Sequence, residues 1–278
     1  SIMASKIWDG TSTPGDWSVA ANWVPSGVPV ATDDVSIPAG SNAITAGLDQ
    51  SAVALGEVTV EKGYSAAIGL ATSYLKLDPN SFRFAGTGES YIDLETSPTT
   101  INPVILATKS NVTAGKRGLY LLGDDIGTLE VYGGIVGLAA QLGETTTVAT
   151  LRLLGSGANV WIGNGVTLTT LDVFKGQAEL KPALTTLNVH AGKVVTEEDG
   201  TITTATVRGG ELVCNSSGTI TTLNIEGGIV DFIQAGKART VSNTKQNPGS
   251  TLIIDEAIVT ITTHVNADEP YRSVLSRI

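Results

Sequence analysis

Hydrophobic and polar residues follow one short pattern that is repeated five times between Gly143 and Phe232. The repeats align on anchor residues at Leu151, Leu171, Leu187, Ala205 and Leu223. An apolar residue stands three positions before each anchor and another stands two positions after it. A Gly, or a Ser in the first copy, stands five positions after the anchor. Successive anchors lie about 16–20 residues apart, and a short repeat of this kind predicts a solenoid.

Each repeat is typical of three short strands. Side chains alternate faces along a strand, so positions −3, 0 and +2 can share one core if the chain bends before the anchor. A third run follows the Gly, as in Gln177–Leu180. Thr, Val and Ile are frequent and no helical period appears, which favours strands. We therefore expect an all-β fold: a single-stranded parallel β-helix with three short strands per rung. The left-handed hexapeptide pattern is missing, so we expect a right-handed coil.

Residues 43–142 carry weaker versions of the pattern. Short alternating runs such as Val58–Val60 and Leu129–Val131 are separated by turn signals such as Asp78-Pro79-Asn80. We expect irregular rungs of the same solenoid here, and an excursion from the rungs in the polar stretch 234–250. The predicted organisation is an N-terminal cap module at 1–40, a β-helix at 41–265, and a C-terminal tail or lid at 266–278.

Residues 6–38 differ from the rest because they hold Trp8, Trp17 and Trp23, three of the four tryptophans. They combine Trp8-Asp-Gly, Gly15-Asp-Trp17, Asn22-Trp23, Gly27-Val-Pro29 and Asp33-Asp-Val35-Ser-Ile37. This segment resembles the N-terminal module of β-solenoid passenger domains of bacterial surface proteins and of some bacteriophage structural proteins. The resemblance implies a β-helix with a Trp-rich cap. An open solenoid end exposes core and strand edges, so a cap is physically reasonable. The alternative is a Trp-lined sugar platform.

The C-terminal segment carries an apolar stripe. Tyr271, Val274, Leu275 and Ile278 fall on one face of a helix. One interpretation is an amphipathic lid on the end of the solenoid. The other is an interaction arm that docks on a neighbouring subunit or on a shell that the protein decorates.

Composition and charge exclude several classes of partner and function. The formal net charge is −10 and no basic run occurs, which argues against nucleic acid as a partner. No apolar stretch approaches the roughly 20 residues of a membrane helix, so we expect no membrane partner. A single Cys excludes an internal disulfide. Met3 reads as an initiator with no secretory signal after it, and we expect a protein that is not exported by the usual route.

Candidate chemistry is sparse. Cys214 falls on an inward position, where a thiol is a small inert core residue. His190 and His264 lack the spaced partners of a zinc site or a Ser–His pair. Polysaccharide-cleaving β-helices require acidic residues that cluster on one face of neighbouring rungs. Asp172 and Glu179 have no acidic residue at the matching position of the next repeat. We therefore expect no catalytic residue, no metal and no cofactor.

A Thr array is the most regular surface feature. Positions −4 and −2 carry Thr in most copies, as at Thr167 and Thr169, and both point away from the core. Flat Thr-x-Thr arrays resemble ice-binding β-solenoids. Thr ladders also suit ordinary exposed strands. The uneven repeat length is expected to spoil a match to a crystal lattice.

Together these patterns predict a non-enzymatic structural protein. We expect a bacteriophage virion component, such as a head decoration protein or a spike, assembled in the host cytoplasm. Its partners would be the capsid shell and two further copies of itself, because such proteins sit on symmetric shells. The alternatives are a passenger fragment of an adhesin at the bacterial cell surface, with a glycan ligand, and a polysaccharide-binding or polysaccharide-cleaving β-helix.

Overall fold

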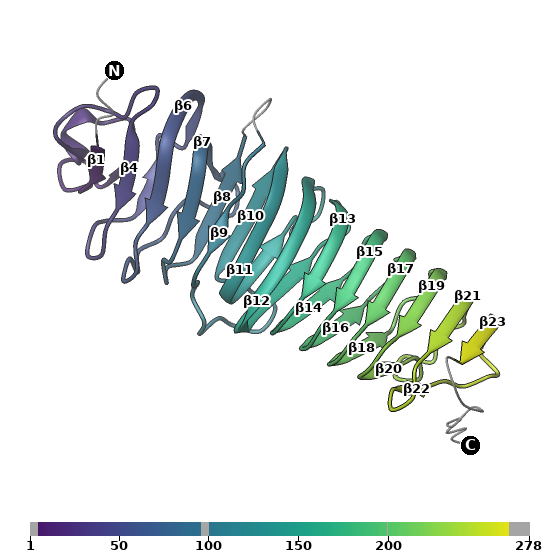
Figure 1. Cartoon of the computed structure of the whole chain (residues 1–278). Coiled ribbons are helices and arrows are strands. Elements are labelled where there is room, and N and C mark those ends of the chain that lie inside the picture. The colour runs from purple at the N-terminus through teal and green to yellow at the C-terminus, as the bar shows by residue number, and fades with distance from the viewer. Residues whose placement is uncertain (1–4, 96–99, 199, 267–278) are drawn as a thin grey trace. The chain divides into compact units, whose positions relative to one another are not determined.

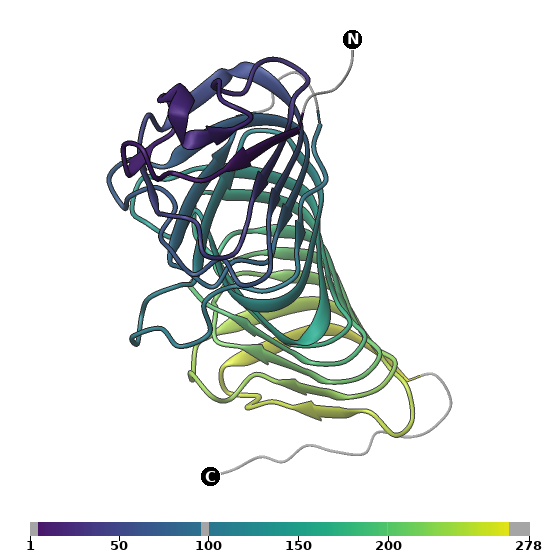
Figure 2. The same ribbon diagram turned by 90° about the vertical axis from the view of Figure 1, so that its left-hand side faces the viewer.

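The chain forms two compact units, residues 1–148 and 149–278. The computed structural model describes residues 5–95, 100–198 and 200–266. Each unit is a β-solenoid in which parallel strands stack turn upon turn (Figures 1 and 2). Within the described residues the only helical segment is the 3₁₀ turn η1 (Ala20–Asn22). The predicted all-β parallel β-helix is therefore confirmed.

The N-terminal unit begins with short irregular strands and continues into longer ones. Its strands are β1 (Ser5–Trp8), β2 (Gly15–Asp16), β3 (Trp23–Val24), β4 (Asp34–Ile37), β5 (Ile44–Ala46), β6 (Asp49–Val60), β7 (Leu75–Phe84), β8 (Ser90–Leu94), β9 (Val104–Ile105), β10 (Leu119–Gly123) and β11 (Ile126–Leu138). The named strands pair in parallel, except that β1 and β3 are antiparallel.

The C-terminal unit contains the regular rungs. Its strands are β12 (Thr146–Ile162), which starts just before the unit, β13 (Val166–Val173), β14 (Gln177–Leu180), β15 (Leu184–Val189), β16 (Lys193–Thr196), β17 (Ile202–Val207), β18 (Glu211–Cys214), β19 (Ile220–Ile225), β20 (Ile229–Asp231), β21 (Arg239–Gln246), β22 (Thr251–Ile253) and β23 (Val259–Asn266). From β13 to β23, each strand pairs in parallel with the equivalent strand of the next rung.

The predicted repeat alignment is the register of the structure. Leu171, Leu187, Ala205 and Leu223 are direct partners on successive strands and are 0% exposed. The residues at −3 and +2 form parallel buried columns beside them. Each rung has one longer bent strand and one short strand. The longer strand contains the first two of the three predicted apolar runs, which continue into each other through the bend before the anchor. Two successive outward residues, such as Thr169 and Thr170, mark that bend.

The corner before each short strand needs a left-handed backbone. Gly176, Gly192, Gly210 and Gly228 occupy it with φ between 69° and 80°. L-residues with a Cβ rarely adopt this conformation. A Cβ on Gly192 would also lie 2.4 Å from the carbonyl oxygen of Gly176 in the rung below. The recurring Gly of the sequence repeat is therefore a steric requirement of stacked corners.

Two local expectations were wrong. The stretch 234–250 is not an excursion, since β21 lies within it and pairs with β19 and β23. Two of its inward positions carry polar residues, Thr244 opposite Leu223 and Gln246 opposite Ile225. The strand therefore lacks the apolar pattern by which the other strands were predicted. Asp78-Pro79-Asn80 is not a turn but the middle of β7, and there the ladder to β6 shifts register.

Candidate functional sites

The three N-terminal tryptophans form one buried cluster. Trp8 and Trp23 lie 5.1 Å apart between ring centroids, and Trp17 and Trp23 lie 4.6 Å apart, both edge to face. The indole N–H of Trp8 donates to the carbonyl oxygen of Asn42 at 2.8 Å, and that of Trp23 donates to the carbonyl oxygen of Trp17 at 2.8 Å. All three side chains are at most 1% exposed. Buried ring faces cannot stack on a sugar, so this geometry favours a packing role.

Asn22 fixes the loop that carries these rings. Its side chain is 0% exposed and uses all of its hydrogen-bonding capacity. Nδ2 donates to the carbonyl oxygens of Thr13 at 2.7 Å and Asp16 at 2.8 Å. Oδ1 accepts from the backbone N–H groups of Ser12 at 2.9 Å and Thr13 at 3.0 Å. In the Asn22-Trp23 pair of the sequence, Asn22 therefore holds the loop by hydrogen bonds, and the next residue, Trp23, places its ring in the buried cluster.

A group of acidic side chains gathers around Lys76 in the N-terminal unit. Asp49, Lys76 and Asp93 are register partners on β6, β7 and β8. Lys76 forms an ion pair with Glu95. Burial, followed by the charge of Glu95, raises the pKa of Asp93 to about 6. The sequence did not reveal this group, because its members come from rungs of unequal length.

This acidic group has one chemical property that an enzyme can use. A carboxyl group with a pKa near 6 is able to hold and release a proton near neutral pH. Asp124 adds a further negative charge that acts on Asp93. Nevertheless, within residues 5–95, 100–198 and 200–266, no three His, Cys, Asp or Glu side chains are grouped so as to hold a metal ion.

Cys214 lies in the core of the C-terminal unit as predicted. It is 3% exposed, and burial raises the pKa of its thiol to about 11, so the thiol is protonated and inert at neutral pH. The nearby Arg239 is 4% exposed and was not recognised from the sequence. Its guanidinium donates to the carbonyl oxygens of Gly218 and, at 3.2 Å, Gly200. It also approaches the Thr196 hydroxyl at 3.5 Å. The buried guanidinium of Arg239 thus links the chain segments at Gly200 and Gly218, which belong to successive rungs.

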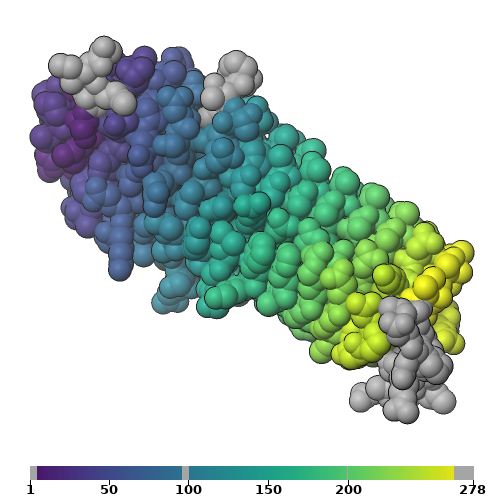
Figure 3. All heavy atoms as spheres, in the orientation of Figure 1, coloured from purple at the N-terminus to yellow at the C-terminus, as the bar shows by residue number. Residues whose placement is uncertain are grey.

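Outward side chains in the C-terminal unit pair from rung to rung. His190 stacks on Phe174 with ring centroids 4.2 Å apart and planes 3° from parallel. Asn188, and no acidic residue, follows Asp172 in the register and donates to it at 2.8 Å. Ion pairs join Lys193 to Glu211 at 3.0 Å and Arg208 to Glu226 at 3.1 Å. In Figure 3 these rungs present a closely packed surface.

A column of Thr residues runs beside the buried anchor column of the C-terminal unit. Thr170, Thr186, Thr204 and Thr222 are direct register partners. These four residues stand one position before the anchors, whereas the predicted Thr-x-Thr array occupies positions −4 and −2. The expectation that the uneven repeat length spoils a match to a crystal lattice therefore stays a prediction. Thr167 and Thr169 are exposed as expected.

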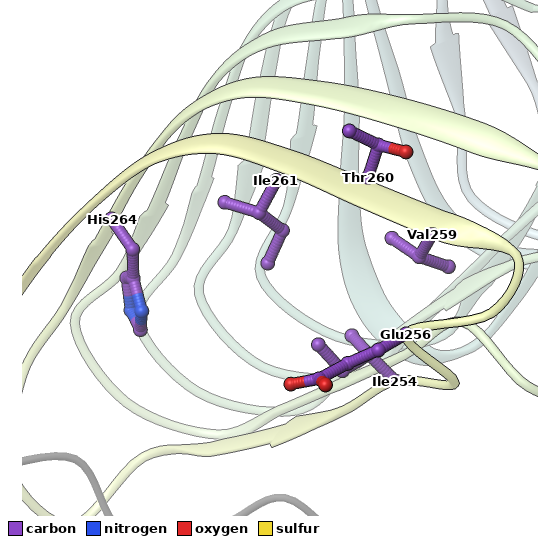
Figure 4. A pocket seen from close by; sticks show the side chains of 6 residues that line it. All are labelled: Ile254, Glu256, Val259, Thr260, Ile261 and His264. Atoms are coloured by element: carbon purple, nitrogen blue, oxygen red, sulfur yellow. The ribbon is translucent and has the colours of Figure 1, made fainter.

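The last described rung borders a pocket of about 420 Å³. Figure 4 shows Val259, Thr260, Ile261 and His264 on β23, with Ile254 and Glu256 on the facing segment. Burial lowers the pKa of His264. The residues of the predicted apolar stripe, Tyr271, Val274, Leu275 and Ile278, lie outside the described residues.

Comparisons with known protein families, curated proteins and solved structures find no match to this chain. In the part of the chain that the structure describes, no helix has the length and apolar character to cross a membrane.

Proposed function

We propose that this protein is a non-enzymatic structural component of a bacteriophage virion, such as a head decoration protein or a spike. The observation that carries the proposal is the pairing of outward side chains between rungs. Asp172 with Asn188 and Arg208 with Glu226 satisfy each other along the solenoid. Such pairing stabilises a stiff stacked scaffold, which is what a structural role requires.

The Trp cluster supports this role. Trp8, Trp17 and Trp23 bury three large rings beside the first rungs of the N-terminal unit. Terminal rungs of a solenoid need a cover, because unpaired strand edges invite aggregation. We assign the three rings to that capping role. The proposal of a virion protein rests further on the resemblance of residues 6–38 to the opening module of bacteriophage structural proteins.

The partners follow from symmetry. A decoration protein or spike binds a symmetric capsid shell, and its simplest own symmetry there is a trimer. Repeated contacts on such a shell multiply weak binding, so each subunit needs only a modest contact area. The net charge of −10 disfavours the packaged nucleic acid as a partner.

Two measurements test the proposal. Light scattering on the purified protein is expected to give the mass of a trimer. Antibodies against the folded protein are expected to label purified phage particles from cultures of the source organism. Labelling of intact cells, with binding to their surface glycans and none to particles, would overturn the virion assignment in favour of an adhesin at the cell surface.

The acidic group around Lys76 favours a second candidate, a polysaccharide-cleaving β-helix. Asp93, with its pKa raised to about 6, is the residue that would act as the acid. The test is a panel of acidic and neutral polysaccharides with viscosity and reducing-end readouts. Cleavage that is lost in Asp93→Asn and kept in Asp78→Asn would establish this candidate, and intact substrates would eliminate it.

A further inference from the structure

Three tyrosine rings pack together on the outer face of strands in the N-terminal unit. Tyr91 on β8 and Tyr120 on β10 are direct register partners on neighbouring strands (Figure 1). Their ring centroids lie 4.5 Å apart, and the ring planes are 8° from parallel. Tyr74 packs against Tyr91 at 5.4 Å, edge to face, with 75° between the planes. Only one of these two ring pairs is therefore stacked face to face.

A neighbouring loop covers the three rings and fixes their positions. Tyr91 and Tyr120 are each 6% exposed, and Tyr74 is 9% exposed. Ala140, in the segment after β11, packs against this cluster. The side-chain amide of Gln141 donates to the phenol oxygen of Tyr74 at 2.9 Å. The stacked pair is therefore held in one arrangement within its own unit.

Tyr91 has a proton acceptor within hydrogen-bonding distance. Its phenol O–H donates to Oε1 of Glu89 at 2.6 Å, and Glu89 is partly exposed. Burial, followed by this hydrogen bond, raises the pKa of the Tyr91 phenol, which is therefore protonated at neutral pH. A protonated phenol that loses an electron becomes a strong acid. Its proton then passes to Glu89 and on to water, because the acceptor is already in place.

Face-to-face stacking is also the geometry in which two phenoxyl radicals can couple. The unpaired electron of such a radical occupies p orbitals perpendicular to the ring, on the oxygen and on the ortho carbons. In the pair of Tyr91 and Tyr120 these orbitals point toward the partner ring. The edge-to-face ring of Tyr74 directs its own p orbitals elsewhere. Because orientation of reacting groups lowers a barrier strongly, the stacked pair is favoured for bond formation.

We propose that Tyr91 and Tyr120 are a modification site, at which a one-electron oxidant forms a dityrosine bridge between two rungs. Each phenol loses one electron to the oxidant and one proton, and the proton of Tyr91 goes to Glu89. The two radicals then form a single bond between one ortho carbon of each ring. The hydrogen on each of these carbons moves to the ring oxygen as a proton and restores the aromatic ring. In total, two electrons and two protons leave the pair.

The bridge gives the chain a covalent link that its cysteine content cannot supply. The sequence contains a single Cys, which excludes an internal disulfide. A bond between Tyr91 and Tyr120 closes a loop in the unfolded chain and restricts its freedom, as a disulfide does. The bridged protein is therefore more resistant to unfolding. This inference goes beyond the proposed function and does not depend on it.

The experiment treats the purified full chain with tris(bipyridine)ruthenium(III), a one-electron oxidant that is generated by light and persulfate. Dityrosine fluorescence follows the rate. A Glu-specific protease places Tyr74, Tyr91, Tyr120 and Tyr132 in four different peptides, so mass spectrometry identifies each linked pair. The reaction is repeated over a hundredfold range of protein concentration, which separates links within one molecule from links between molecules.

Three single substitutions accompany the wild type. Tyr120→Phe keeps the stacked ring but removes one phenol, and Glu89→Gln removes the proton acceptor. The matched control is Tyr132→Phe, which removes an exposed phenol outside the cluster. Each protein is also unfolded in urea before and after oxidation.

The expected product is a linked pair of the Tyr91 and Tyr120 peptides that has lost two hydrogen atoms, at a rate independent of protein concentration. Tyr120→Phe abolishes this product, Glu89→Gln slows it severalfold, and Tyr132→Phe leaves it unchanged. The bridged protein unfolds at a higher urea concentration. A product that links Tyr74 to Tyr91 instead, or links that form only between molecules, overturns the proposal. Equal rates in the wild type and in Glu89→Gln also contradict it.

Discussion

Asn22 and Thr13 hold each other through two opposite hydrogen bonds. The Asn22 side chain donates to the Thr13 carbonyl oxygen at 2.7 Å and accepts from the Thr13 N–H at 3.0 Å. Asn22→Asp replaces a donor with an acceptor that faces two carbonyl oxygens. We expect the free energy of unfolding to fall by about 1–3 kcal/mol or more. Urea unfolding measures this, with Asn80→Asp at an exposed position as the control; equal stability of both variants would refute the clamp.

A single buried rung residue is expected to matter strongly. Leu187 is 0% exposed between Leu171 and Ala205 in its column. Leu187→Ala should lower the free energy of unfolding by about 2–5 kcal/mol, because the stacked rungs cannot collapse into the cavity. Thr185→Ala, on the outer face of the same strand, should change it by less than about 0.5 kcal/mol. Similar losses in the two variants would contradict the inward and outward assignment.

The glycine corner gives a sharper contrast. Gly192 has φ of 80°, and an added Cβ would collide with the carbonyl oxygen of Gly176. Gly192→Ala is expected to cost about 1–3 kcal/mol from backbone strain alone. Gly157 lies in β12, and a Cβ there meets nothing within 4 Å. Gly157→Ala should be neutral or stabilise by up to about 1 kcal/mol, through lower entropy of the unfolded chain. Thermal unfolding of both variants tests this, and a tolerated Gly192→Ala would argue against the stacked corner.

The buried guanidinium of Arg239 is expected to be structural. Arg239→Met keeps the apolar stem but leaves the carbonyl oxygens of Gly200 and Gly218 without this donor. We expect a loss of about 1–3 kcal/mol in the free energy of unfolding. Arg208→Met removes a surface ion pair with Glu226 and should cost less than about 1 kcal/mol. The prediction is wrong if the two substitutions cost the same.

Asp93 predicts a pH dependence of stability. Its pKa is raised from 3.8 in a free side chain to about 6, so the folded protein binds more protons than the unfolded chain between these values. The stability that the neutral Asp93 carboxyl group contributes is therefore lost as pH rises from about 4 to 6. The Asp93→Asn side chain stays neutral at every pH. The free energy of unfolding of this variant should therefore equal that of the wild type near pH 4, exceed it increasingly up to pH 6, and exceed it by a constant amount above pH 6. Denaturant titrations at several pH values measure this, with Asp78→Asn as the control for loss of one carboxylate; a flat difference would disprove the shift.

Periodicity predicted the regular rungs because their inward residues are apolar and their corners carry Gly. The same reasoning failed for β21, where Thr244 and Gln246 fill core positions. Gln246 is satisfied locally, since its Nε2 donates to the carbonyl oxygen of Ser250 at 3.2 Å. A buried polar residue with a partner close in sequence looks the same as a loop residue when only hydropathy is read.

The candidate sites were harder to predict than the rungs. Trp8, Trp17 and Trp23 were found because rare large residues cluster in sequence as well as in space. Asp49, Lys76 and Asp93 meet only through register, across irregular rungs that periodicity cannot align. Arg239 had no signal in the sequence, because two of its partners are backbone carbonyl groups, which every residue carries, and the third, Thr196, lies 43 residues away.

The two corners of a rung differ in how much they vary in length. The glycine corner is constant from rung to rung, at 174–176, 190–192, 208–210 and 226–228. The other corner spans 181–183 in one rung, 197–201 and 215–219 in the next two, and 232–238 in the last of them, while the ladders stay in register. Loop-closure entropy rises only slowly with length. This side of the C-terminal unit is therefore a natural grafting position, where a foreign peptide can be inserted and displayed without disturbing the stacked strands.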